Sequence, residues 1–504
     1  MKKTRNIFTV ALNFIEKTGN VLPHPATLFA IAAALVLVFS RIGNALGWSV
    51  THPGTKEIIT VKNLLTVDGL HRIMVEMVPN FTSFAPLGIV LVAMLGIGVA
   101  EYTGLINSLI KMVVLYAPEK LLTFTIVFAG IMSNIASDAG YVLLIPLAGI
   151  IFHAAGRHPI AGMVAAFAGV SGGFSANLSI STLDPMLSGL SQEAAGILDP
   201  SVIVLPTANY YFMVVSTFFI AAVGTFITDK IVEPRLGTYK GEASSEKTEL
   251  SGKEKKGILY AVIASSVIIA IILAGIIPEN GFLRAADGSI LTSPLISGII
   301  TVLFVLFVVA GIAYGIGVGT VKNDADVIAG MEESMKSMAL YIVLAFFAAQ
   351  FVMFFKWSDL GIIIAVKGAE FLMSTELSLI PLVIFFVLLS GAFNLFVGSA
   401  SAKWALLAPI FVPIFMILGF SPDLAQAVYR IGDSTTNIIS PMMSYFALII
   451  AFIRKYDKKA GIGTIVSHMV PYSIGFLIVW TLLLIIWISF EIPLGPGAEL
   501  FYTP

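Results

Sequence analysis

The side chains that could do chemistry in this sequence are ionisable residues set inside apolar stretches. Arg430, Asp433 and Asn437 stand at positions i, i+3 and i+7, so a helix would place all three on one face. A guanidinium binds a carboxylate through two parallel hydrogen bonds, which makes Arg430 a candidate clamp for an anionic solute. A structural ion pair between Arg430 and Asp433 is the alternative interpretation.

A second polar face occurs earlier in the chain. Asn177, Ser181 and Asp184 stand at i, i+4 and i+7. Burial in a low-dielectric cavity favours the neutral form of a carboxyl group, so Asp184 and Asp433 are candidate proton carriers. The alternative for Asp184 is an ordinary residue at the end of a membrane span, facing water.

Two neighbouring pairs of apolar runs meet without a loop, each at one charged residue. The runs within 121–156 meet at Asp138, and those within 377–422 meet at Lys403. A broken backbone at membrane depth is tolerated where it lies against protein or water, so each pair is predicted to form a re-entrant hairpin. The candidate tip and binding residues are Asn134, Ser137 and Asp138 in the first hairpin, and Asn394, Gly398 and Ser401 in the second.

Two residues beside the second tip, Lys403 and Trp404, could contribute to the site or to packing. The Trp404 ring could stack on an aromatic solute, or could only pack the hairpin. Lys403 could extend its ammonium group to the membrane interface. The chain has no cysteine and six scattered histidines, so no metal centre is predicted, although a sodium ion near the tips stays open. The sequence has no Walker A motif, which argues against ATP as the energy source.

The composition determines the class of protein that must position these residues. Of 504 residues, 58% are hydrophobic and 12% charged, against about 25% charged in a soluble domain. The mean hydropathy is +0.96. These values exclude a soluble enzyme, a disordered protein and a nucleic-acid-binding protein. Because lipid cannot satisfy an open backbone, we expect an all-α polytopic membrane protein.

The apolar runs and the charge distribution predict its topology. Thirteen long stretches lack Asp, Glu, Lys and Arg, and four of these form the hairpins, which leaves nine transmembrane helices. With a cytoplasmic N-terminus, the inner segments hold 20 Lys and Arg and the outer segments 7. The predicted divisions are a cytoplasmic lead-in (1–24), two membrane halves (25–228 and 257–490), a cytoplasmic linker between them (229–256) and an external tail (491–504).

A repeat relates the two hairpin regions at an offset of 263 residues. Six identities fall in one register, among them Pro146 with Pro409 and Gly156 with Gly419. The charge distribution gives the two copies opposite orientations. Inverted repeats with broken helices are typical of secondary transporters that bind their solute near the membrane midplane.

Several motifs resemble the p-aminobenzoyl-glutamate transporter (AbgT) family, and the likeness covers nearly the whole chain. They are GNVLPHPATLF near the N-terminus, NFTSFAPLG (80–88), GRHPIAGMVAAFAGVSGGFSANL (156–178), GSASAKWALLAPIFVPIF (398–415), YRIGDSTTNIISPMMSYF (429–446) and PLGPGA (493–498). The resemblance implies a homodimer of bowl-shaped subunits in a bacterial inner membrane, each with nine spans and two hairpins. It also implies functional positions at Asp184, Ser401, Trp404, Pro422, Arg430 and Asp433, with Asn394 and Gly398 at the matching hairpin.

We therefore predict an ion-driven secondary transporter and not an enzyme. The family's activities suggest import of p-aminobenzoyl-glutamate or efflux of sulfonamide antimetabolites, with no cofactor and with protons as the coupling ion. The hairpin tips also look distantly like those of sodium-coupled carboxylate transporters, so sodium is the alternative ion. A passive channel or receptor and an intramembrane hydrolase are rival classes, but the sequence shows neither a filter motif nor a convincing nucleophile–base pair.

Overall fold

The predicted all-α class is confirmed by the computed structural model. The structure describes residues 23–52, 56–135, 140–239, 249–290, 292–375, 378–440, 443 and 445–502. In these ranges the only strands are β1 (Ser49–Thr51) and β2 (Ile58–Thr60), which pair antiparallel. Apolar helices satisfy their own backbone hydrogen bonds, which is what a lipid environment requires.

The first half of the chain contains ten described α-helices. They are α2 (Pro25–Ala45), α3 (Val67–Thr82), α4 (Ala85–Tyr102), α5 (Leu105–Leu115), α6 (Leu122–Met132), α7 (Ile145–Ala154), α8 (Pro159–Phe167), α9 (Leu183–Ala195), α10 (Tyr210–Ile227) and α11 (Glu233–Leu236). Short tight or wide turns join or extend them: η1 (Glu119–Leu121), η2 (Ser133–Ile135), η3 (Gly140–Leu144), η4 (Ala168–Gly172) and η5 (Thr228–Val232). Through η5 and α11 the helical structure continues beyond α10 into the predicted linker.

The second half contains eleven. They are α12 (Gly252–Ile276), α13 (Pro294–Ser297), α14 (Ile299–Val318), α15 (Asp324–Ser337), α16 (Ala339–Trp357), α17 (Leu360–Ser374), α18 (Leu379–Asn394), α19 (Ala400–Ile417), α20 (Pro422–Asn437), α21 (Phe446–Ile453) and α22 (Ile462–Ser489). Eight helices of the described chain are long and apolar enough to cross a membrane, or nine if the bent pair 105–115 and 119–135 forms one span. The total of nine spans with two hairpins stays a prediction.

Helices end close to both predicted hairpin tips. Helix α6 ends at Met132 and the tight turn η2 follows it, while residues 395–399 separate α18 from α19. Both limbs of the first hairpin pack against α8, and both limbs of the second pack against α20. At 11 residues, α6 is about 16 Å long, about half of a 30 Å hydrocarbon core.

The helix ends agree with the offset of 263 residues. Helix α7 ends at residue 154 and α19 at 417, α8 begins at 159 and α20 at 422, and α9 begins at 183 and α21 at 446. Gly156 and Gly419 also share a left-handed backbone, with φ of 73° and 85°. Both follow the end of a helix, where glycine is the residue that adopts this conformation without strain. The inversion of the two copies stays a prediction.

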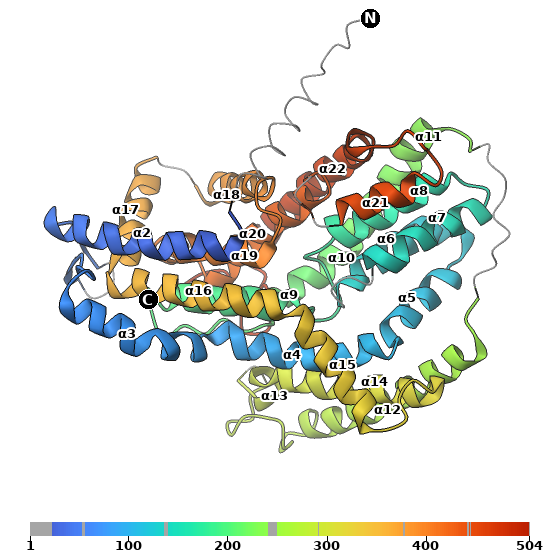
Figure 1. The fold of residues 1–504 in the computed structure, drawn as a ribbon, viewed down its shortest axis with the longest axis horizontal. Coiled ribbons are helices and arrows are strands. Elements are labelled where there is room, and N and C mark those ends of the chain that lie inside the picture. Colours follow the sequence, from blue (N-terminus) through green and yellow to red (C-terminus); the bar gives the residue numbers. More distant parts are fainter. Residues whose placement is uncertain are drawn as a thin grey trace, which may run out of the picture.

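The periphery and the centre of the molecule differ in chemistry. In Figure 1, α12 and α14 lie along one edge, while α9, α19 and α20 occupy the middle. Helix α12 carries exposed apolar side chains such as Leu259, Ile263 and Val267, as a lipid-facing helix should. The central helices α9, α19 and α20 carry the buried charged residues Asp184, Lys403, Arg430 and Asp433.

Candidate functional site

The polar centre is built on α20, a helix that is buried despite its charges. Its residues are buried from its first position through Thr435, including Arg430 and Asp433. Ser421 caps the helix by accepting a hydrogen bond from the Leu424 N–H at 3.1 Å. Buried charges destabilise a fold unless they are paired, so the partners of Arg430 and Asp433 decide what this helix can do.

Arg430 pairs with Asp184. Arg430 Nη2 donates to Asp184 Oδ1, and the two side chains are 4% and 1% exposed. The other carboxylate oxygen accepts hydrogen bonds from the Ser181 N–H at 2.6 Å and from Ser181 Oγ at 2.9 Å. Arg430 therefore does not form the ion pair with Asp433 that their spacing allowed, and Asp184 does not face water. The pair joins α9 of the first half to α20 of the second.

Asp433 pairs instead with Lys403. The Lys403 ammonium group donates to Asp433 Oδ1 and to Asn394 Oδ1, and the side chains of the ion pair are 0% and 1% exposed. Among the described residues, Asp433 Oδ2 has no hydrogen-bond partner. The expectation that Lys403 extends to the membrane interface is wrong, because its ammonium group finds two oxygen acceptors in the interior.

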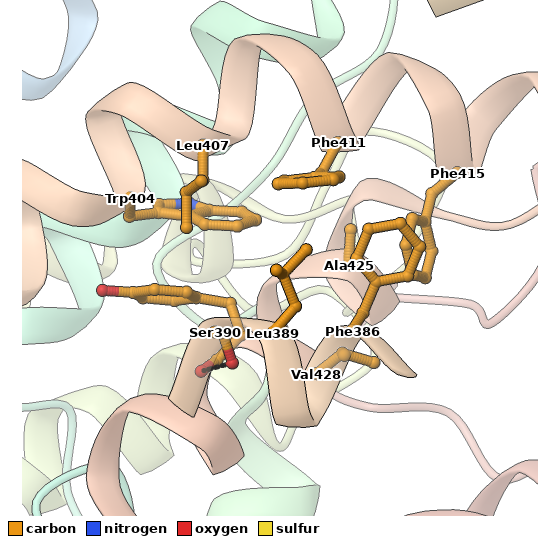
Figure 2. Close-up of a pocket in the computed structure, with 10 residues that line it drawn as sticks. Phe386, Leu389, Ser390, Trp404, Leu407, Phe411, Phe415, Ala425 and Val428 are labelled. Atoms are coloured by element: carbon orange, nitrogen blue, oxygen red, sulfur yellow. Dashed lines mark hydrogen bonds between the residues drawn. The ribbon is translucent and has the colours of Figure 1, made fainter. Parts of the chain in front are cut away.

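Trp404 packs inside the second hairpin region. Its ring stacks on Tyr429, with centroids 4.6 Å apart and planes at 24°, and its Nε1 donates to Ser191 Oγ at 2.9 Å. Figure 2 shows Trp404 on the same helix as Phe411 and Phe415, beside an apolar cavity of about 20 Å³. That space is too small for an aromatic solute, so in this structure Trp404 has the packing role that was the alternative interpretation.

A chain of buried amides and hydroxyls connects Trp404 to Arg430. Ser191 Oγ donates to Gln426 Oε1 at 2.7 Å, and Gln426 Nε2 donates to Asn209 Oδ1 at 3.0 Å, which also accepts from Arg430 Nη1 at 3.5 Å. None of these three residues was predicted from the sequence. Ser191 stands seven residues after Asp184 and Gln426 four before Arg430, so helical spacing could have found both. Asn209 precedes α10 and has no such signal.

A cavity of about 260 Å³, which we call the tip cavity, is lined by polar and apolar residues from both hairpin regions. Its wall includes the start of α19 at Ser399, Ala400 and Ser401, together with Tyr141 from the first hairpin and Tyr445. The two tyrosine rings stack, with centroids 4.4 Å apart and planes at 10°. Neither tyrosine was among the predicted site residues, although Tyr445 lies inside the motif 429–446 and Tyr141 is three residues after Asp138.

The predicted site residues divide between this cavity and the core beneath it. Those in the cavity wall are Asn134, Gly398, Ser401 and Asn437. Those in the packed core are Asp184, Asn394, Trp404, Pro422, Arg430 and Asp433. The predicted tip residues Ser137 and Asp138 lie outside the described residues.

Metal-ligating side chains do not gather in the described part of the chain. No group of three or more His, Asp or Glu residues there could hold a metal ion. The described side chains of the site supply paired charges, amides, hydroxyls and aromatic rings.

Comparison with known proteins places this arrangement in a family. The model of the AbgT putative transporter family matches residues 10–502. The p-aminobenzoyl-glutamate transport protein of Escherichia coli (strain K12) is 41% identical over 485 residues, which are 96% of each chain.

Two solved structures share the fold. The YdaH transporter of Alcanivorax borkumensis superposes with a TM-score of 0.90 at 45% identity, covering 94% of this chain and 100% of that one. MtrF of Neisseria gonorrhoeae, described as illuminating a class of antimetabolite efflux pumps, gives a TM-score of 0.90 at 48% identity over 94% and 97% of the chains. The chain therefore belongs to the AbgT putative transporter family.

Proposed function

We propose that this protein is a proton-coupled secondary transporter of p-aminobenzoyl-glutamate and related aromatic carboxylates or sulfonamides. The observation that carries the proposal is the pair of buried ion pairs beside the tip cavity, Asp184 with Arg430 and Asp433 with Lys403. The curated relative supports the solute, and the antimetabolite efflux pumps support the sulfonamides.

The coupling follows from the position of these carboxylates. Asp184 on α9 holds α20 through Arg430, so a proton on Asp184 would remove an attraction between the two halves of the molecule. A proton on Asp433 would likewise release Lys403 from α20. A ligand shifts a conformational equilibrium only through its different affinity for the two states, and a proton that breaks an interhelical ion pair meets this condition.

The remaining features of the proposal concern assembly and placement. We infer a homodimer in a bacterial inner membrane, with the N-terminus cytoplasmic and the C-terminus external. The excess of Lys and Arg on the inner segments supports this orientation. Sodium is the alternative coupling ion, supported by the hydroxyl and amide oxygens around the tip cavity.

Transport into proteoliposomes tests the proposal. With p-aminobenzoyl-glutamate outside, we expect accumulation that follows an imposed pH gradient, collapses with an uncoupler and returns chemically intact solute. Asp184→Asn and Asp433→Asn should abolish accumulation, whereas Glu279→Gln in an exposed loop should not. Accumulation by both Asp variants under a pH gradient would contradict proton coupling. Dependence on a sodium gradient alone would replace the proton by sodium.

A further inference from the structure

One wall of the tip cavity, formed by the first residues of α19, carries hydrogen-bond donors. This helix starts at Ala400 with Ser399 as its cap, and its first backbone bond is donated by the Lys403 N–H to the Ser399 carbonyl at 3.0 Å. The Ser399 hydroxyl caps the Ala402 N–H at 3.4 Å. The N–H groups of Ala400 and Ser401 therefore have no acceptor within the helix, and both residues line the cavity. This wall offers hydrogen-bond donors and a partial positive charge.

Lys403 fixes the orientation of the Asn394 side chain beneath this wall. An ammonium group can only donate hydrogen bonds, so the Asn394 atom that meets the Lys403 Nζ must be the carbonyl oxygen. The Asn394 amide nitrogen then points the other way. Its two hydrogens are shared among three acceptors, the Asp433 carbonyl at 2.6 Å, Thr436 Oγ1 at 2.8 Å and Asn437 Oδ1 at 2.9 Å.

Asn394 in turn fixes the orientation of Asn437 in the cavity wall. Because Asn437 Oδ1 accepts from Asn394, its Nδ2 is turned away from that contact, and this nitrogen donates to no described side chain or backbone group. The Lys403 ammonium group thus orients Asn394, and Asn394 orients Asn437 so that its N–H donors face the cavity. A carboxylate accepts such hydrogen bonds, and the added charge makes them stronger than neutral ones.

The first hairpin supplies the opposite polarity. Asn134 is 5% exposed and lines the cavity, and its Nδ2 is occupied by the carbonyls of Ile131 (3.1 Å) and Val170 (3.0 Å). Its Oδ1 accepts no hydrogen bond from any described residue, so it offers an acceptor to the cavity. The stacked pair of Tyr141 and Tyr445 adds an aromatic surface to the same wall.

We propose that Lys403, acting through Asn394, orients Asn437 so that its amide and the start of α19 bind a carboxylate of the solute. The other end of the solute, an aromatic ring with an N–H donor, then lies against the tyrosines and Asn134 Oδ1. This assignment rests on the proposed function and names the carboxylate subsite of that transporter. Lys403 is a positioning residue here, since its ammonium group touches Asn394 and Asp433 and not the cavity.

Two probes test the carboxylate subsite in the purified full-length protein. They are p-aminobenzoyl-glutamate and its diamide, in which neutral amides replace both carboxylates. Asn437→Asp keeps the acceptor for Asn394 but replaces the donors by a negative oxygen. We expect it to lower affinity for the dicarboxylate about tenfold or more and to change affinity for the diamide less than about twofold. Asn280→Asp in an exposed loop is the matched control and should change neither.

The outcomes separate the two proposals. Equal loss of both probes in Asn437→Asp, or no loss of either, overturns the carboxylate subsite while leaving a transporter. A wild-type protein that binds and exchanges neither probe overturns the proposed function itself. Retained binding of the diamide shows that the variant is folded.

The role of Lys403 is tested by comparing a variant that keeps its ammonium group with one that removes it. Asp433→Asn alone leaves the ammonium group on Asn394, so the preference for dicarboxylate over diamide should persist in binding measurements. Lys403→Met combined with Asp433→Asn frees the Asn394 amide to turn over, and the preference should fall at least about fivefold toward equality. The same preference in both variants would overturn the positioning role, whatever happens to transport.

Discussion

Two groups of ion pairs in the described chain differ strongly in exposure. In the core, Lys403 with Asp433 and Arg430 with Asp184 are at most 4% exposed. After α7, Arg157 bridges Asp229 and Glu233, and these three side chains are 22% to 37% exposed. The same types of charged side chain are therefore shielded from water in the core and accessible to water in the Arg157 cluster.

This difference in exposure makes the buried pairs weak evidence for stability. A buried ion pair is often matched or exceeded in stability by well-packed apolar residues, while removal of one partner leaves an uncompensated charge. The half-exposed Arg157 cluster keeps water as an alternative partner, so each contact there contributes little. The two buried pairs link α20 to α9 and to α19, which fits the role in transport proposed above.

The largest effect is expected where a charge that cannot be neutralised is left alone. Asp184→Ala strands the guanidinium of Arg430, which keeps its proton at any working pH, so we expect a loss of about 3–5 kcal/mol. This loss of stability is measured by heating the protein in detergent and detecting the folded fraction by size-exclusion chromatography. Adding Arg430→Met to Asp184→Ala should recover most of the loss. If the stability of Asp184→Ala were within about 1 kcal/mol of wild type, the core pairs and the Arg157 cluster would not differ as expected.

A smaller effect is expected at the second buried pair. Lys403→Met strands Asp433, but a carboxylate can take up a proton and become neutral, so the loss should be about 1–3 kcal/mol. Melting temperatures of the variant and the wild type provide the measurement, with Lys367→Gln at an exposed ion pair as the control. A deficit as large as that of Asp184→Ala would argue against this difference between the two buried pairs.

The sequence predicted which residues would be central but not how they would pair. Apolar runs were enough to predict the all-α class, because that depends on local composition. Spacing along one helix put Arg430 beside Asp433, but tertiary packing brings Asp184 and Lys403 to them from other elements. The stacking of Trp404 on Tyr429 is likewise a contact between helices, which periodicity within each helix cannot reveal.

At the half-exposed cluster the expected effect is about 1 kcal/mol. Arg157 donates to Thr123 Oγ1 at 2.7 Å and to Asp229 Oδ1 at 2.6 Å, and Glu233 also pairs with it. Arg157→Gln keeps some of the hydrogen bonding, and water can solvate the two carboxylates that remain. The loss should decrease in 1 M salt, where exposed charges are screened. A loss as large as that of Asp184→Ala would show that exposure is not what separates the two places.

The smallest effect is expected beside that cluster, at His158, and it depends on pH. Burial lowers the pKa of His158, and the charge of Glu233 opposes this only in part. The neutral ring caps α8, since His158 Nδ1 accepts from the Ile160 N–H at 3.2 Å. A folded pKa below the unfolded value of about 6.5 means that this contribution is complete above pH 6.5 and is lost as the pH falls through the lower folded value.

The expected loss at His158 is about 0.5 kcal/mol, the low end of the range for a helix cap. His158→Asn keeps an oxygen that can cap α8 but has no group that titrates between pH 5 and 7. The difference in melting temperature between wild type and His158→Asn, followed over this range, isolates the histidine from its neighbours. We expect the wild type to lose stability relative to the variant below pH 6.5. Parallel profiles would mean that protonation of His158 does not weaken the cap of α8.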